Sequence, residues 1–203
     1  MDSKGSPLDD LAVAHAAAEA VRKAQAVGLI DRSPDFPELT YPQVRQAAAR
    51  VREAGIAADA AGIVERRDPP AAAELARALR DIDACLEESP LPDTEWPRLT
   101  AILESGQLAA LLGISASSLV RYAKGERRTP DEVAARLHVL ALVVGDLAGA
   151  YNALGIRRWF ERPRTALAGR TPASSLRGAW APDNEGARRV RALARALVTS
   201  PGA

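Results

Sequence analysis

Apolar residues recur along most of this 203-residue chain at the three- and four-residue spacing of amphipathic helices. The first such segment predicts a helix over about 8–27. Its apolar side comprises Leu8, Leu11, His15, Ala18 and Val21. Prolines at 34, 37 and 42 predict a loop over 31–42. Shorter helices are predicted near 42–55 and 57–65.

A longer helix is predicted over 71–88, with one apolar side that carries Leu75, Leu79, Ile82 and Leu86. Residues 87–93 have the composition of a linker, and Pro90, Pro92 and Pro97 are expected to stop any helix there. The chain is therefore predicted to be all-α, in three parts. These are an N-terminal helical domain of unknown role (1–90), a middle domain (94–152) and a small C-terminal domain (153–203).

The composition agrees with a helical fold and sets a cellular context. Alanine occurs 43 times, whereas the aromatic residues are only 3 Trp, 3 Tyr and 2 Phe, so helix formers far outnumber strand formers. The sequence contains no run of 18 apolar residues, so no membrane-spanning helix is expected. The acidic N-terminus lacks the apolar core of a signal peptide. The single cysteine, Cys85, suits a reducing compartment. We therefore expect a cytoplasmic protein that contacts no membrane.

Charge is distributed unevenly along the chain. Residues 1–90 carry 11 basic and 16 acidic side chains, whereas residues 156–203 carry 10 basic and 3 acidic ones. A basic C-terminal quarter indicates an acidic partner, either a nucleic acid or an acidic protein surface. An arginine-rich face that only contacts solvent is the alternative.

The segment Ser105–Lys124 has the pattern of a helix-turn-helix unit. The fifth position, where two helices cross closely, is Ala109, and the ninth, in the turn, is Gly113. The positions that face the core are Leu108, Leu112, Ile114, Leu119 and Tyr122. Every position fits, so the pattern predicts a helix-turn-helix with its second helix after Ser115.

This second helix is predicted to bind DNA. Ser115 is placed to cap its N-terminus, and Arg121 could form a bidentate contact with guanine. The predicted DNA-binding residues are Ser115, Ser117, Ser118, Arg121, Lys124, Arg127 and Arg128. The last two follow the helix and could hold the phosphate backbone. Helix-turn-helix units also serve as protein-contact modules, so a protein adaptor is an alternative.

Motifs for enzymatic chemistry are absent from the sequence. It contains no phosphate-binding glycine loop, no paired cysteines and no metalloprotease motif. His15 and His138 lie on predicted apolar helix faces, where packed histidines are expected, and no base can be placed near Cys85. We therefore expect no enzyme activity, no cofactor and no bound metal.

The C-terminal region carries a further pattern. Trp159 is followed by Pro163, by Leu-Ala-Gly-Arg-Thr-Pro over 167–172, and by Leu176. With the preceding helix-turn-helix, this order resembles the Xre/MbcA/ParS-type antitoxins, whose hallmark is a Trp, a Pro and a Leu-Gly-Gly-x-x-Pro segment followed by Leu. Here Ala168 replaces the first glycine. The resemblance covers about 94–198.

The resemblance implies a dimeric repressor of its own operon that neutralises a partner toxin, often of the NAD-consuming RES type. The C-terminal domain would then bind the toxin and contribute to dimerisation. The residues expected to bind the toxin are Trp159, Arg170, Arg188, Arg191 and Arg195. For Trp159, simple core packing is favoured over direct toxin contact. The alternative is a helix-turn-helix transcription regulator without a toxin, in which residues 1–90 sense a signal or form oligomers.

Overall fold

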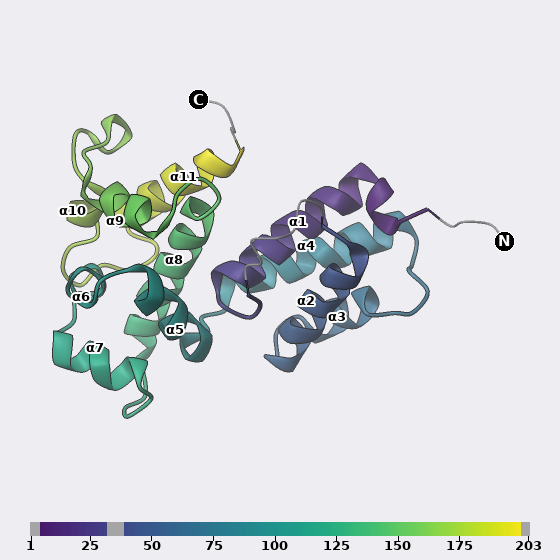
Figure 1. Ribbon diagram of the computed structural model, residues 1–203, viewed down its shortest axis with the longest axis horizontal. Helices are drawn as coiled ribbons and strands as arrows, with labels where there is room; N and C mark the ends of the chain where they lie inside the picture. Colours follow the sequence, from purple (N-terminus) through teal and green to yellow (C-terminus); the bar gives the residue numbers. More distant parts are fainter. Residues whose placement is uncertain (1–4, 32–38, 200–203) are drawn as a thin grey trace. The chain divides into compact units, whose positions relative to one another are not determined.

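A computed structural model describes residues 5–31 and 39–199, and within these residues the chain is all-α, without a strand (Figure 1). The predicted loop over 31–42 lies mostly outside the described residues. The chain divides into two compact units, Met1–Ser89 and Pro90–Ala203. The predicted boundary near residue 90 agrees with this division, whereas the one expected between 152 and 153 falls inside the second unit.

The described part of the first unit, residues 5–31 and 39–89, is built from four α-helices and one short 3-10 helix. In order these are η1 (Pro7–Asp9), α1 (Leu11–Ala26), α2 (Tyr41–Glu53), α3 (Ala58–Val64) and α4 (Ala72–Glu88). Helices α1 and α4 lie side by side along most of their length, and α2 and α3 pack across them (Figure 1). The predicted apolar side of α4 is buried as expected, through Leu75, Leu79, Ile82 and Leu86.

The predicted buried face of α1 is wrong. Leu11, His15 and Ala18 are exposed, whereas Val21 is buried as predicted. The helix instead buries a face that comprises Val13, Ala16, Ala17, Ala20 and Ala24. It also starts later than expected, because Asp10 caps it by accepting hydrogen bonds from the amides of Ala12 (2.9 Å) and Val13 (3.1 Å). Alanine fits both faces of a helix, so spacing alone could not identify the small-residue face that lies against α4.

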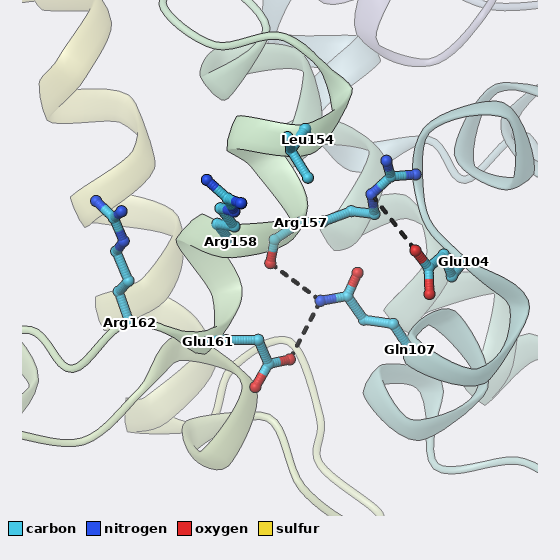
Figure 2. Close-up of a pocket in the computed structure, with 7 residues that line it drawn as sticks. All are labelled: Glu104, Gln107, Leu154, Arg157, Arg158, Glu161 and Arg162. Carbon is cyan, nitrogen blue, oxygen red and sulfur yellow. Dashed lines mark hydrogen bonds and ion pairs between the residues drawn. The ribbon is translucent and has the colours of Figure 1, made fainter.

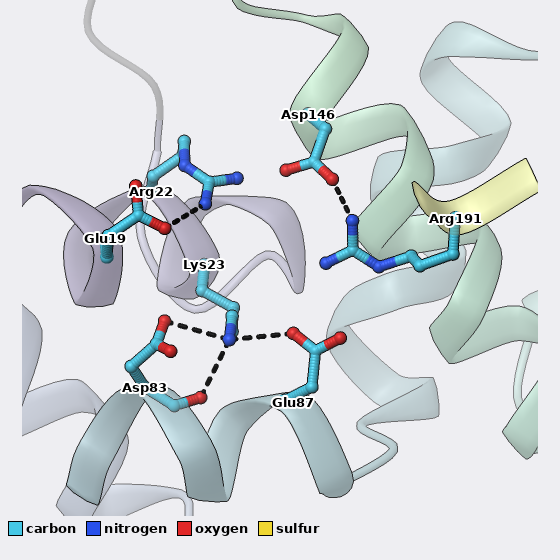
Figure 3. Close-up of polar contacts among 7 residues, drawn as sticks. All are labelled: Glu19, Arg22, Lys23, Asp83, Glu87, Asp146 and Arg191. Carbon is cyan, nitrogen blue, oxygen red and sulfur yellow. Dashed lines mark hydrogen bonds and ion pairs between the residues drawn. The ribbon is translucent and has the colours of Figure 1, made fainter. Parts of the chain in front are cut away.

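A lysine is buried between α1 and α4. The Lys23 side chain is only 2% exposed, and its Nζ lies 2.9 Å from Asp83 Oδ1 and 2.7 Å from Glu87 Oε2 (Figure 3). Nζ also donates to the Asp83 carbonyl at 3.0 Å. Because a buried ammonium is stable only with partners, these contacts fix how α1 and α4 align.

Within its described residues, 90–199, the second unit contains seven α-helices and one short 3-10 helix. They are α5 (Pro92–Ile102), α6 (Ser105–Leu112), α7 (Ala116–Ala123), α8 (Asp131–Leu147), α9 (Ala153–Glu161), η2 (Thr165–Leu167), α10 (Pro172–Ser175) and α11 (Glu185–Thr199). The prediction that Pro97 stops a helix is wrong, because Pro97 lies inside α5. Proline has no N–H, so the helix loses the hydrogen bond that residue 97 would donate to the carbonyl of Asp93. Because Asp93 is exposed, its carbonyl can bind water instead.

One hydrophobic core runs through the whole second unit. Helix α8 lies at its centre and is buried over almost its entire length, while α5 and α11 pack against it. The core includes Leu108 and Leu119 from the helix-turn-helix as well as Trp159, Trp180 and Val190 from the C-terminal segment. The segments 94–152 and 153–203 therefore share their core.

A polar pair is enclosed between α5 and α8. Glu95 is fully buried, and its Oε1 lies 2.5 Å from His138 Nδ1. Burial raises the pKa of the Glu95 carboxyl above its ordinary value, and the hydrogen bond to His138 opposes this rise. His138 is thus a packed core histidine, as predicted from the sequence.

Candidate functional site

The segment Ser105–Lys124 forms two short helices joined by a tight turn. Gly113 ends α6 with a left-handed backbone (φ 67°), which glycine adopts without strain. Ser115 then caps α7, because its Oγ accepts a hydrogen bond from the Ser118 amide at 3.1 Å. Both local features agree with the sequence prediction.

The core-facing positions of this unit are also as predicted. Leu108, Ala109, Leu112, Leu119 and Tyr122 are buried, and Ile114 is half-buried against the same core. Tyr122 stacks on Trp96 of α5, with ring centroids 6.3 Å apart. This packing fixes the rotation of α7 about its axis, so its opposite face is directed to solvent.

The solvent face of α7 brings together the predicted DNA-binding side chains. Ser117, Arg121 and Lys124 are exposed, while Ser118 is half-buried. The hydroxyl of Ser115 lies 3.0 Å from those of both Ser117 and Ser118, so the three form a hydroxyl cluster at the helix N-terminus. Such a cluster can donate hydrogen bonds to a phosphate or a base edge.

The cations that follow α7 have weak internal contacts. The Lys124 ammonium lies 3.8 Å from Glu126, and the Arg128 guanidinium lies 3.0 Å from Asp131. Arg127 lies over the Tyr122 ring, 5.7 Å from its centroid. These ion pairs are exposed and contribute little to stability, so a phosphate can replace the carboxylates at small cost.

Hydrogen bonds hold the turn of the helix-turn-helix against the C-terminal segment. Arg136 of α8 donates to the carbonyls of Leu112 and Trp180, each at 2.8 Å. The Trp180 indole donates to the Leu111 carbonyl, also at 2.8 Å. The last carbonyls of α6, which have no partner within the helix, are thereby satisfied from outside it. Sequence reasoning missed Arg136 and Trp180, because their roles depend on contacts over 24 to 69 residues.

The segment that carried the family resemblance forms a compact turn. Leu167, Pro172 and Leu176 are buried in the core of the second unit or at its edge. Ala168 (φ 54°) and Gly169 (φ 78°) are both left-handed. Two consecutive left-handed residues favour two glycines, so the backbone gives a physical reason for a Gly-Gly pair at these positions. Ala168 takes up the same conformation at the cost of some strain.

Two of the toxin-binding candidates contact the protein's own core, and for Trp159 core packing is the favoured expectation. Trp159 is buried, where it packs edge-on against Phe160 (5.3 Å between centroids) and beneath Arg164. A partner could not reach Trp159 without opening the core. Arg191 of α11 forms an ion pair with the buried Asp146 of α8 (Figure 3). Arg170, Arg188 and Arg195 are exposed, so the structure leaves their prediction open.

Helix α9 presents a surface that sequence reasoning missed. Tyr151 (36% exposed) and Leu154 (48% exposed) precede Arg158 and Arg162 along one side of the helix. Figure 2 shows Arg157 extending toward Glu104, whereas Arg158 and Arg162 extend away from Glu104. Neither Arg158 nor Arg162 forms an ion pair with any described residue. Arg158 and Arg162 are exposed, whereas Trp159 on the same segment is buried. The spacing of residues along the sequence did not reveal the exposure of the two arginines.

A groove of about 440 Å³ lies between α9 and α6. Gln107 lines the groove and donates hydrogen bonds to the Arg157 carbonyl and to Glu161, both at 3.1 Å (Figure 2). Glu104, Leu154, Arg158 and Arg162 complete its lining. Most of its lining side chains are charged, unlike the largely apolar pockets that bind small molecules.

One further exposed side chain lies on the solvent face of α7. Val120 is 43% exposed, between the polar side chains predicted to contact DNA. The twenty-position pattern assigns it no role, because that pattern specifies only the positions that face the core.

Neither a metal cluster nor a membrane helix is found among the described residues. No group of three or more His, Cys, Asp or Glu side chains in 5–31 and 39–199 could hold a metal ion. Within the same residues, every helix is too short or too polar to cross a membrane.

The chain matches no protein-family model, no curated protein and no solved structure.

Proposed function

We propose that the protein is a sequence-specific DNA-binding transcription regulator that inserts α7 into the major groove. The observation that carries the proposal is the orientation of α7, whose buried Leu119 and Tyr122 turn Ser117, Arg121 and Lys124 toward solvent. The second helix of a helix-turn-helix contacts base edges through such a face. A two-fold dimer of the chain would read two half-sites about one helical turn apart.

Replacing Arg121 by alanine is expected to weaken binding to the preferred DNA sequence by about 1–3 kcal/mol, because a guanine contact is lost. The DNA is first selected from random duplexes by the wild-type protein, and affinity is then measured by titration. Arg80→Ala is the matched control, since it removes one exposed arginine from the first unit. Equal affinities of wild type and Arg121→Ala would rule out a base contact by Arg121.

A second candidate function is that of an antitoxin that represses its own operon in the cytoplasm. It is supported by the left-handed pair Ala168 and Gly169 at the hallmark positions, and by the exposed apolar and basic side chains of α9. A partner toxin of the RES type would then bind the C-terminal segment. A regulator without a toxin, in which residues 1–90 sense a signal or form oligomers, is the alternative.

Growth of cells separates these two functions. The reading frame next to the gene is induced alone and then together with this protein; we expect arrest in the first case and rescue in the second. Truncation at Asn152 would be uninformative, because it removes Trp159, Trp180 and Val190 from the shared core. The double variant Arg158→Glu, Arg162→Glu is used instead and is expected to abolish rescue, while Arg80→Glu retains it. No arrest under confirmed expression would favour the regulator without a toxin.

A further inference from the structure

Val120 is an apolar residue on a face that is otherwise polar. With 43% of its surface exposed, it is one of four large exposed apolar residues in the described part of the chain, the others being Leu11, Tyr151 and Leu154. It is the only one of the four that lies in the helix-turn-helix. Successive residues of a helix are about 100° apart, so Ser117, Val120, Arg121 and Lys124 share an arc of about 100°. Val120 is therefore directed to the same side of the helix as Ser117, Arg121 and Lys124.

The fold gains little from a valine at this position. Valine is a weaker helix former than alanine, arginine or glutamine, because its branched side chain loses rotamer freedom against the preceding turn. The buried positions of α7 are Leu119 and Tyr122, and Val120 is not part of that core. A polar residue would suit an exposed position of α7 at least as well.

The major groove of DNA offers one apolar group to such a side chain, the 5-methyl group of thymine. We propose that Val120 contacts this methyl group and so selects a T·A pair at one position of the binding site. The proposal rests on the proposed DNA-binding function and names the base-pair class that one residue reads. Val120 and Arg121 differ by about 1.5 Å along the helix axis. The selected thymine should therefore lie within one or two base pairs of the guanine read by Arg121.

The test uses the full chain and DNA selected by the wild-type protein from random duplexes. Each thymine in the selected site is replaced in turn by deoxyuridine, which lacks only the methyl group. At one position we expect the affinity of the wild type to fall about four-fold, the equivalent of about 0.8 kcal/mol for one buried methyl-sized group. Replacing that T·A pair by C·G should weaken binding further, and 5-methylcytosine should restore part of the loss.

Val120→Ala is expected to reduce this dependence on the methyl group, and Val120→Ser to remove it. Leu154→Ala, which truncates an exposed apolar residue on α9, should keep the full four-fold effect. Thermal unfolding of each variant confirms that the fold is retained, as the exposure of both side chains leads us to expect. A four-fold effect that persists in Val120→Ser, or no methyl-dependent position in a site that the wild type binds, would overturn the assignment of Val120. No selected DNA at all would overturn the proposed DNA-binding function and this assignment together.

Discussion

Replacing Arg191 by alanine is expected to lower the free energy of unfolding of the second unit by about 3 kcal/mol. Its partner Asp146 is only 1% exposed, and the Arg191 side chain itself is 14% exposed, so water screens this ion pair poorly. Without the guanidinium, the buried carboxylate of Asp146 would lose its ion pair with Arg191, and α11 would lose a polar anchor on α8. Denaturant titration with tryptophan fluorescence measures the effect. All three tryptophans, Trp96, Trp159 and Trp180, lie in this unit.

Arg188→Ala supplies the matched control. Arg188 lies one turn earlier on the same helix and is exposed, so its replacement should change the stability by no more than about 0.5 kcal/mol. The double variant with Asp146→Ala completes a mutant cycle, in which the two losses should not add. Equal stability of wild type and Arg191→Ala would contradict a structural role and return Arg191 to the residues available for a partner.

Gly113→Ala is expected to destabilise the second unit by about 3 kcal/mol, the sum of two separate costs. The left-handed backbone disfavours any residue with a Cβ by about 1–2 kcal/mol. A Cβ on Gly113 would also lie 2.5 Å from the Gly178 carbonyl oxygen, which belongs to the segment held by Arg136 and Trp180. Relieving this overlap requires movement of the backbone, at a further cost of about 1–3 kcal/mol.

Gly125→Ala separates the two costs. Gly125 has nearly the same backbone conformation (φ 69°), but a Cβ there would meet nothing within 4 Å. Its replacement should therefore cost only the backbone term, about 1–2 kcal/mol. Because Gly113 lies between α6 and α7, its variant should also weaken the proposed DNA binding at temperatures where it is still folded. Equal losses of stability in the two variants would show that the approach of Gly178 is unimportant.

Local features of the helix-turn-helix were predictable from the sequence. These features are the glycine in its turn, the serine that caps α7 and the five apolar positions. Each depends on conformational requirements of residues close to it in the sequence. These requirements act within about ten residues, so the order of residue types is sufficient to recognise them. The orientation of α7, and with it the exposure of Arg121 and Lys124, follows from the same pattern.

Predictions that depended on which face of a helix is buried were less successful. In α1 the alanines made the two faces alike, and the helix buries Val13 and Ala17 rather than Leu11 and His15. On α11, the sequence could not distinguish Arg191, which pairs with the buried Asp146, from Arg188, which is exposed. The partner of Arg191, Asp146, lies on α8, and spacing along one helix does not contain that information.

The sequence by itself determined the helical fold class, the division near residue 90 and the helix-turn-helix with its outward basic residues, because each arises from local periodicity, capping and turn geometry. Only the tertiary structure decided that the C-terminal segment shares the core of the helix-turn-helix, and that Arg136 and Trp180 complete α6. These features depend on contacts between residues far apart in the chain, and such contacts form only when the helices pack together.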